Sequence, residues 1–236
     1  MYSFIIPAHN EEKLLPRTLR AIHDAAKVLA GPYEIIVAND ASTDTTEQVA
    51  LQHGARVVNV DHRQISKTRN SGAAEAQGDI FVFVDADTFV NDALLKSMHN
   101  RLQNGIVGGG AVVALGGNLP LYGRVFGPIF TFIYSRAGFA AGCFIFCKRD
   151  AFQAINGFDE TLFAGEELEF TRQMRRQGKF KILREPVVTS GRKLRTHTAR
   201  ELASTVFGFM LQGPKALKSR DKLDMWYGER REDTEV

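Results

Sequence analysis

The chain has 236 residues, of which 44% are hydrophobic and 24% are charged, and its formal net charge is +3. This length suits one large α/β domain or two small ones that share a sheet, and the composition excludes a largely disordered body. A net charge of this size gives no reason to expect nucleic-acid binding, so we expect no nucleic-acid partner.

The first predicted strand, YSFIIP, covers residues 2–7. A helix should follow, with Asn10 as its N-cap and Glu11 at the positive end of its dipole. Gly31 and Pro32 predict where this helix ends. Its apolar residues recur at spacings of four and three, which is one stripe of a helix: Leu15, Leu19, Ile22, Ala26 and Leu29.

A second strand is predicted at residues 33–38 and a third at residues 56–60. Between them, Asp44 and Glu47 have the spacing of a capping box and predict a helix that stops at Gly54. Strands and helices that alternate through short connections, with continuous apolar strands, favour a parallel sheet covered on both faces. The sequence therefore predicts an α/β fold.

The fourth predicted strand leads into two carboxylates. The apolar run IFVFV at residues 80–84 precedes Asp85, Ala86 and Asp87. Two carboxylates one residue apart can share a divalent cation, because Mg²⁺ and Mn²⁺ prefer hard oxygen ligands and leave positions for substrate phosphates. The pair therefore indicates chemistry on a nucleotide diphosphate, although Asp87 alone would also suit the start of a helix predicted at residues 92–103.

The alternation of strands and helices becomes less regular after this helix. Residues 106–117 are glycine-rich and predict a strand or a hairpin. Residues 127–147 are about as long as a membrane-spanning helix, but they contain Arg136 and several glycine and proline residues. We therefore expect a helix or loop followed by a buried strand, and contact between the aromatic part and lipid stays open.

The last third of the chain is predicted to contain two helices. The first covers residues 165–177, with acidic residues early and arginines late, as the helix dipole favours. One or two short strands are predicted at residues 181–190. Thr198 and Glu201 form a capping box, which predicts a second helix to about Leu211.

Cys143 and Cys147 have a spacing that matches no common zinc or thioredoxin motif. Both lie in an apolar run, which predicts buried free thiols in a reducing compartment. The first residues, MYSFIIPAHNEE, lack the basic segment of a signal peptide. We therefore expect a cytoplasmic protein. Basic residues outnumber acidic ones between Arg172 and Lys222, so peripheral contact with the inner face of the membrane stays open.

Polar side chains lie at the ends of the predicted strands. Ligands of open parallel sheets bind beyond the carboxyl ends of the strands, at a switch in strand order. We therefore expect one rim of the sheet to gather these residues: His9, Asn10 and Glu11 after the first strand, Asn39 and Asp40 after the second, Lys67, Arg69 and Asn70 before the fourth, and Asp85 and Asp87 at its end.

Five motifs occur in order between residue 3 and about residue 190: PAHNEE, VANDASTDTT, KTRNSGAAEAQGD, VDADT and GFDE…GEELEF. In this series the chain resembles the family 2 glycosyltransferases with the GT-A fold. The resemblance implies a Rossmann-like, mostly parallel central sheet with helices on both faces. It also implies metal-dependent transfer of a sugar, with inversion at the anomeric carbon, from a nucleotide diphosphate sugar to a hydroxyl acceptor.

The resemblance divides the chain into three functional parts. Residues 1–112 would form the nucleotide-sugar-binding half of the domain. Residues 113–197 would form its acceptor-binding and catalytic half. Residues 198–236 would form a C-terminal helical extension and a polar tail.

The resemblance also implies roles for individual residues that bind the donor. Pro7, Ala8 and Glu11 would line the nucleoside pocket. Asp40 would accept a hydrogen bond from the base, and Arg69 would contact the base or the phosphates. The family often has two aspartates where this chain has Asn-Asp, so the base stays open, with a UDP-sugar as the first expectation.

Metal binding is assigned in the same way. Asp85 would contact the ribose or the metal, and Asp87 would hold the metal, which we expect to be Mg²⁺ or Mn²⁺. His197 is a third candidate ligand, because some related enzymes use a histidine from this later region; a surface histidine near a helix start is the alternative. Arg192 is a candidate for the donor diphosphate or an acceptor phosphate, because arginine pairs bidentately with phosphate.

An inverting transfer needs a general base that takes the proton of the acceptor hydroxyl. The resemblance assigns this role to an acidic pair at the start of a helix, here Glu166 and Glu167. Neighbouring residues point about 100° apart on a helix, so only one of them can face the site squarely. We expect the base to be Glu167, with Glu166 as the second candidate. The Gln-x-x-Arg-Trp motif of processive members is absent, which favours a non-processive enzyme.

Three other functions are weighed. A Rossmann dehydrogenase would need G-x-G-x-x-G after the first strand, where this chain has PAHNEE. A sugar-phosphate nucleotidyltransferase would need a glycine-rich phosphate loop at the same place. A noncatalytic nucleotide-sugar-binding or membrane-peripheral module would not need Asp87 and Glu167.

The sequence leaves the acceptor open. The aromatic segment 123–139 and the basic C-terminal third suit a lipid-linked or membrane-proximal acceptor. They suit a plain hydrophobic core and a soluble acceptor equally well.

Overall fold

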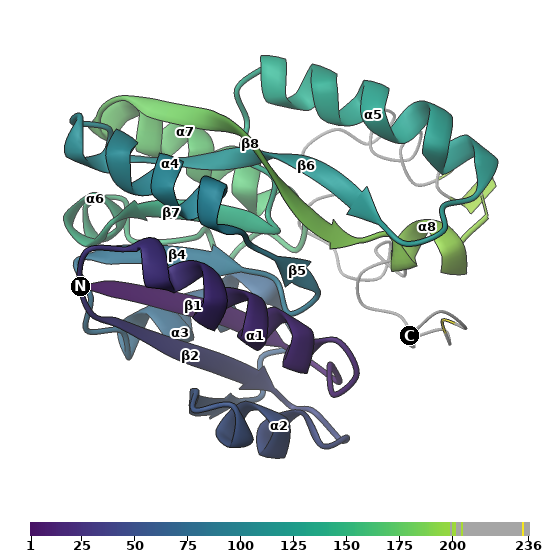
Figure 1. The fold of residues 1–236 in the computed structure, drawn as a ribbon, viewed down its shortest axis with the longest axis horizontal. Helices are drawn as coiled ribbons and strands as arrows, with labels where there is room; N and C mark the ends of the chain where they lie inside the picture. The colour runs from purple at the N-terminus through teal and green to yellow at the C-terminus, as the bar shows by residue number, and fades with distance from the viewer. Residues whose placement is uncertain (199, 202–203, 205–232, 234–236) are drawn as a thin grey trace.

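A computed structural model describes residues 1–198, 200, 201, 204 and 233 of the chain. In this part, a mixed sheet lies between two layers of helices (Figure 1). Its strands are β1 (Tyr2–Ala8), β2 (Tyr33–Asp40), β3 (Arg56–Val60), β4 (Ile80–Val84), β5 (Thr88–Phe89), β6 (Gly108–Gly116), β7 (Phe144–Lys148) and β8 (Phe180–Ser190). The helices are α1 (Leu15–Ala25), α2 (Thr46–Gln52), α3 (Ile65–Ala74), α4 (Asp92–Gln103), α5 (Leu121–Arg136), α6 (Arg149–Ala154), α7 (Glu166–Gln177) and α8 (Arg192–Thr196), with a 3₁₀ turn at Ala26–Val28.

The sheet has the strand order β3-β2-β1-β4-β7-β6-β8-β5. Strands β1 to β4 are parallel. The chain runs outward from β1 through β2 to β3 and then returns to place β4 on the other side of β1, so the strand order switches between β1 and β4. Ligands of such sheets bind beyond the carboxyl ends of the strands at this switch.

Each central strand is buried on both faces, as its continuous apolar sequence predicts. Phe4 and Ile6 of β1 point to the layer that contains α1 and α4, whereas Ile5 points to the layer that contains α3, α6 and α7. All three side chains have no exposed surface. The two cores cover both faces of the sheet, and the strand ends place polar residues at one rim.

The second half of the chain extends the same sheet beyond β4, and β7 is reversed whereas β6 and β8 run in the same direction as β4. Strand β7 is antiparallel to β4 and to β6, and β6 and β8 are parallel to each other. The predicted boundary between residues 112 and 113 falls inside β6, so the two predicted halves share one continuous sheet, and their separate functions stay predictions.

The glycine-rich segment forms one strand, β6, because its glycines lie against other backbones. A Cβ on Gly109 would lie 2.1 Å from the carbonyl oxygen of Lys181 in the neighbouring strand. Residues 127–147 contain the second half of α5 and then β7, which is the predicted helix followed by a buried strand. None of the helices in the described ranges is long and apolar enough to cross a membrane.

Of the three helix starts predicted from capping residues, one is wrong, one is partly confirmed and one is confirmed. Helix α1 begins at Leu15, because Asn10 has a left-handed backbone (φ 51°) and accepts a hydrogen bond from Thr43 N instead of capping a helix. Helix α2 begins at Thr46, whose backbone nitrogen donates to Asp44 Oδ1 at 2.9 Å, but Glu47 accepts from Asn59 instead of closing the capping box.

The third predicted start is the capping box of Thr198 and Glu201. It is present: Thr198 N donates to Glu201 Oε2 at 2.7 Å, and Glu201 N donates to Thr198 Oγ1 at 3.3 Å. The helix predicted from there to about Leu211 lies largely outside the residues that the structure describes.

Candidate functional site

The switch in strand order gathers the predicted rim residues. Glu11 follows β1, and Asp85 and Asp87 follow β4. Helices α3 and α8 bring Arg69 and Arg192 to these carboxylates. The structure therefore brings together acidic and basic side chains that lie far apart in the sequence, at the place where an α/β sheet binds ligands.

Arg69 is the centre of one half of this cluster. Its Nη1 donates to Glu166 Oε1 at 2.8 Å, and its Nη2 donates to Asp85 Oδ1 at 3.0 Å and to the carbonyl oxygen of Gly142 at 2.9 Å. Only 1% of the Arg69 side chain is exposed. Burial alone would lower the pKa of Arg69, but Asp85 and Glu166 together raise it. Arg69 therefore stays charged and holds α3, α7 and the end of β4 together.

Arg192 is the centre of the other half. It binds Glu11 bidentately, with Nη1 to Oε2 at 3.1 Å and Nη2 to Oε1 at 2.9 Å. Its Nη2 also lies 3.5 Å from Asp87 Oδ2. Thr189 Oγ1 donates to the other oxygen of Asp87 at 3.4 Å. Arg192 thus connects α8 to Glu11, which follows β1, and to Asp87, which follows β4.

Asp87 has the chemistry of a cation ligand. Its burial, with the nearby charges of Glu11 and Asp85, raises the pKa of the Asp87 carboxyl to about 6, although Arg192 opposes this shift. Burial and the two neighbouring carboxylates both disfavour the charged form of Asp87, and a divalent cation at this position would favour it. The oxygen ligands of Asp87 and Asp85 therefore fit Mg²⁺ or Mn²⁺.

The third predicted metal ligand lies in a different setting. The Nδ1 of His197 is 3.1 Å from Thr196 Oγ1 and 3.2 Å from the carbonyl oxygen of Lys193. Within the described ranges, no three or more His, Cys, Asp or Glu side chains gather closely enough to hold a metal ion. In this conformation, His197 does not join Asp85 and Asp87 in such a group, and its metal role stays a prediction.

The two glutamates at the start of α7 have different surroundings. Glu166 is buried and paired with Arg69. Glu167 instead lies beside Tyr134 of α5, whose hydroxyl is 3.4 Å from Glu167 Oε1. Burial and the neighbouring charge of Glu166 raise the pKa of Glu167 to about 7. A group with such a pKa can accept a proton near neutral pH, whereas the carboxylate oxygen of Glu166 is already paired with the guanidinium of Arg69.

The predicted nucleoside residues lie at the same rim. Pro7 and Ala8 end β1. Asp40 ends β2, and its carboxylate accepts from the backbone nitrogens of His62, Arg63 and Gln64 and from Thr68 Oγ1. Asp40 thus fixes the loop that enters α3, and a contact with a base would add a fifth donor. The nucleoside roles stay predictions.

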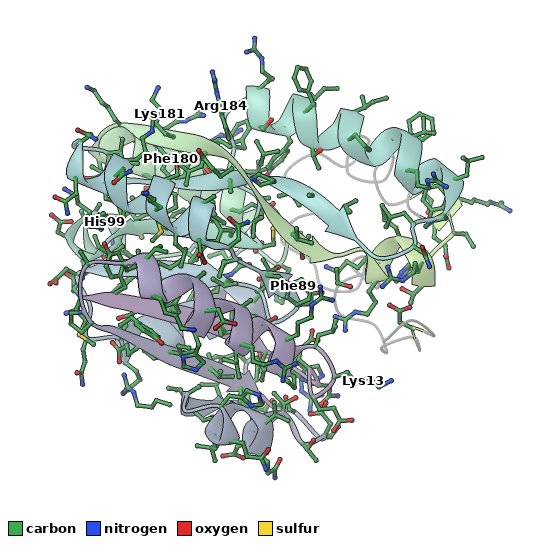
Figure 2. All side chains as sticks on the ribbon, viewed as in Figure 1. Lys13, Phe89, His99, Phe180, Lys181 and Arg184 are labelled. Carbon is green, nitrogen blue, oxygen red and sulfur yellow. The ribbon has the colours of Figure 1, made fainter. Side chains whose placement is uncertain are left out.

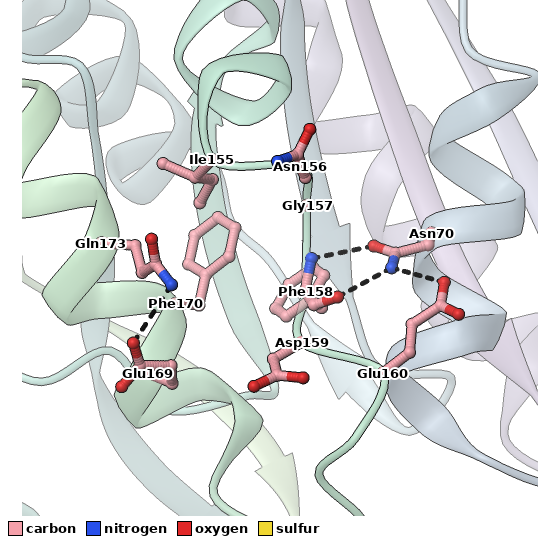
Figure 3. A pocket seen from close by; sticks show the side chains of 10 residues that line it. All are labelled: Asn70, Ile155, Asn156, Gly157, Phe158, Asp159, Glu160, Glu169, Phe170 and Gln173. Atoms are coloured by element: carbon pink, nitrogen blue, oxygen red, sulfur yellow. Dashed lines mark hydrogen bonds between the residues drawn. The ribbon is translucent and has the colours of Figure 1, made fainter.

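A cavity of about 300 Å³ lies between α3, the segment after α6 and helix α7 (Figure 3). Asn70 forms one wall and binds the backbone of Phe158 in both directions, with its Oδ1 accepting from N and its Nδ2 donating to O. Glu169 and Gln173 of α7 form the opposite wall, and Phe158 stacks on Phe170 between them. Since 100° separates neighbouring helix residues, Glu169 and Gln173 point away from the side of Glu167. The cavity therefore lies on a different side of α7 from Glu167.

Two site residues were missed by the sequence analysis. Tyr134 touches Glu167, and Thr189 touches Asp87. Tyr134 lies within the aromatic segment 123–139, where nothing local distinguishes it from core residues. Thr189 lies near the end of a strand, where threonine is common. No sequence pattern indicated either contact, because both partners lie far away in the chain.

The sequence model described as "Glycosyl transferase family 2" matches residues 3–155, which is more than half of the chain. The chain is 32% identical over 117 residues to the 4,4'-diaponeurosporenoate glycosyltransferase of Staphylococcus haemolyticus, covering 44% of this chain and 30% of that protein. It is 34% identical over 93 residues to the undecaprenyl-phosphate 4-deoxy-4-formamido-L-arabinose transferase of Pseudomonas fluorescens, covering 36% and 27%. The chain thus spans less than a third of the length of both relatives.

Solved structures resemble the fold over most of the chain. The mannosyltransferase PcManGT from Pyrobaculum calidifontis, in complex with GDP-Man and Mn²⁺, has a TM-score of 0.65 and 19% sequence identity. The match covers 89% of this chain and 61% of that one. At this identity, the likeness concerns the fold.

Proposed function

The chain belongs to glycosyl transferase family 2, and we propose that it moves a sugar from a nucleotide diphosphate sugar to a hydroxyl acceptor with inversion at the anomeric carbon. Its sheet with helices on both faces is the GT-A fold expected from the sequence. The observation that carries the proposal is the different state of the two glutamates of α7. Arg69 pairs with Glu166, which leaves Glu167 at the site with a pKa of about 7.

In this proposal, Glu167 takes the proton of the acceptor hydroxyl. The acceptor oxygen forms a bond to the anomeric carbon while the bond from that carbon to the diphosphate breaks, and the nucleoside diphosphate leaves. A Mg²⁺ or Mn²⁺ held by Asp87 and Asp85 would neutralise charge on the leaving diphosphate. Arg192 lies beside Asp87 and has the fork geometry that pairs with phosphate oxygens.

The acceptor determines how much a base matters. The name of the Pseudomonas fluorescens relative contains a lipid phosphate, undecaprenyl phosphate. A phosphate acceptor is already ionised near neutral pH and needs no general base, whereas a hydroxyl must lose its proton. A pKa of about 7 for Glu167 therefore favours a hydroxyl acceptor, which a lipid can also carry. A lipid-linked acceptor and a cytoplasmic, membrane-peripheral location are part of this proposal.

The test is product analysis with UDP-, GDP- and dTDP-sugars, Mn²⁺ and a panel of alcohol and phosphate acceptors. Release of nucleoside diphosphate that requires an acceptor supports the proposal, and an inverted anomer in the product supports the stereochemistry. Release of pyrophosphate would instead indicate a nucleotidyltransferase. A donor that raises the melting temperature without any turnover would indicate a binding module.

The base is tested by Glu167→Gln, with Glu169→Gln on the other side of α7 as the matched control. We expect Glu167→Gln to lower kcat by roughly 10²–10⁴ with a hydroxyl acceptor and Glu169→Gln to have little effect. In the unsubstituted enzyme, kcat should rise as the pH increases through about 7, because Glu167 acts in its ionised form. A normal rate for Glu167→Gln would refute the assignment.

The metal site is tested separately by Asp87→Ala. We expect this variant to keep its fold and to lose metal-dependent turnover, since the carboxylate that holds the cation is removed. Circular dichroism checks the fold, and titration of Mn²⁺ after removal of metal by a chelator checks the dependence. An Asp87→Ala enzyme with an unchanged response to Mn²⁺ would show that another residue holds the metal.

A further inference from the structure

Helix α5 carries large apolar side chains on the face that points toward solvent. Leu121, Val125, Phe126, Ile129, Phe132 and Ile133, which we call the α5 stripe, are between 50% and 77% exposed. At 100° per residue, the six positions fall within an arc of about 140° around the helix axis, so they form one continuous surface. In Figure 1, α5 lies along the upper edge of the molecule, on the opposite side from α2.

The opposite face of α5 is shaped for contact with the rest of the protein. A Cβ on Gly123 would lie 2.9 Å from Leu194 Cδ1, and a Cβ on Gly127 would lie 3.2 Å from Leu115 Cδ1. These two glycines allow the helix to approach β6 and α8 closely. Tyr134 lies on the same inner side and contacts Glu167. The orientation of α5 is therefore set by its inner face, and rotation to bury the stripe would break these contacts.

The charges on α5 are complementary to an anionic surface. The helix contains two exposed arginines, Arg124 and Arg136, and its sequence has no acidic residue. Lys181 and Arg184 project from the same edge of the molecule in the view of Figure 2. A helix with an apolar face, flanking cations and no carboxylates is typical of segments that lie in the interface of a bilayer. Anionic lipids attract such cations within a Debye length.

A second copy of the chain fits the same surface less well. Most homodimers are two-fold symmetric, so the same patch contacts itself. Apposition of two α5 stripes would bring the arginines of the two copies together with no carboxylate on the helix to neutralise them. This difference favours a lipid surface as the occupant.

We propose that the α5 stripe docks on the surface of an anionic phospholipid bilayer and thereby presents Glu167 to an acceptor carried in the membrane. The helix links the two sites directly, since the stripe lies on its outer face and Tyr134, on its inner face, contacts Glu167. The role in acceptor delivery rests on the proposed function. The docking itself does not, because it depends only on the exposed apolar surface and the arginines.

The test is flotation of the full chain with vesicles of phosphatidylglycerol and phosphatidylcholine, without donor or acceptor. The double variant Phe126→Asp and Phe132→Asp removes the stripe. Leu51→Asp is the matched control, because Leu51 is 57% exposed on α2 and Phe132 is 63% exposed on α5. We expect the double variant to lower the vesicle-bound fraction at least roughly tenfold and the control to bind like the unsubstituted chain. Binding should weaken with vesicles of phosphatidylcholine alone and at high salt.

Three outcomes would overturn the docking proposal: no flotation of the unsubstituted chain at low salt, equal flotation of the double variant, or a dimer that the double variant converts to a monomer in sedimentation velocity without any vesicle binding. The last outcome would assign the stripe to self-association. Flotation without sugar transfer would leave the docking standing and refute the proposed function. Sugar transfer without flotation would support the proposed function and refute the docking.

Discussion

Helices α1 and α5 both have an apolar stripe at helical spacing, yet the stripes face opposite ways. Leu15, Leu19 and Ile22 of α1 have no exposed surface. The equivalent stripe of α5 is more than half exposed at Phe126 and Phe132. Helical periodicity therefore predicts that a stripe exists, but it does not predict whether the stripe faces the core.

The opposite faces of the two helices explain the difference. Helix α1 has exposed polar residues on its outer side, among them Arg17 and Arg20, which favour water. Helix α5 has Gly123 and Gly127 on its inner side, which allow the backbone to pack closely without large side chains. The arginines of α1 and the glycines of α5 thus determine which face of each helix packs against the protein.

Two arginines, one buried and one exposed, differ in the same way, and we expect the largest effect on stability from the buried one. Arg69 is buried between Asp85 and Glu166, whereas Arg136 is exposed at the end of α5. Arg69→Met leaves two carboxylates without their buried partner and should lower the free energy of unfolding by about 3–5 kcal/mol. Arg136→Met should change it by no more than about 0.5 kcal/mol. Urea denaturation of both variants measures the difference, and equal stabilities would contradict the role given to Arg69.

The second largest loss of stability is expected from a substitution in the buried apolar stripe of α1. Leu19→Ala in α1 should lower the free energy of unfolding by about 2–5 kcal/mol, because it removes buried methyl groups and leaves a cavity between α1 and the sheet. The midpoint of urea denaturation should fall while the slope of the transition stays the same. A loss below about 0.5 kcal/mol would mean that Leu19 is not in a packed core.

Glu167 lies beside α5, and we expect it to have a smaller, pH-dependent effect on the free energy of unfolding. Its pKa is raised from 4.5 to about 7 in the folded protein, so between these values the folded state binds more protons than the unfolded state. The stability that this residue contributes is therefore fully present below about pH 4.5 and is lost as the pH rises through about 7. Compared with Glu167→Gln, the unsubstituted protein should become progressively less stable from pH 5 to pH 8. Urea midpoints of both proteins at these two pH values test this, and a gap that does not change with pH would contradict it.

The smallest effect is expected on the exposed stripe. Phe132→Ala is the counterpart of Leu19→Ala, but Phe132 is 63% exposed. Its removal should change the free energy of unfolding by no more than about 0.5 kcal/mol, since little surface is returned to water. The same urea titration measures it. A loss of several kcal/mol would show that part of the protein covers α5 in solution.

Much of the fold and part of the candidate site could be predicted from the sequence. Helix α4 begins and ends where predicted, at Asp92 and Gln103. Strand β3 also has its predicted bounds. The carboxylates Asp85 and Asp87 lie at the predicted strand end, and the rim that they share with Glu11 follows from the strand–helix alternation. Such features depend on neighbours within a few residues, which a local pattern records.

The predictions that failed involve competition from distant residues. Asn10 has the composition of an N-cap, but its side chain accepts a hydrogen bond from Thr43, 33 positions further along the chain. Glu47 has the spacing of a capping box, but it accepts from Asn59 on β3. In both cases, a partner from another part of the chain, a strand–helix connection for Asn10 and strand β3 for Glu47, replaced the local one.

By itself, the sequence determined the order of the helices and strands, the chemistry available at the ends of β1 and β4, and the presence of two adjacent acids at the start of α7. Only the tertiary structure decided which acid is paired, because Arg69 reaches Glu166 across 97 positions. It also decided that Arg192 binds Glu11 across 181 positions, and that the α5 stripe faces outward. The physical reason is that hydrogen bonds within a helix or turn join near neighbours, whereas ion pairing and burial depend on which distant segments the sheet order brings together.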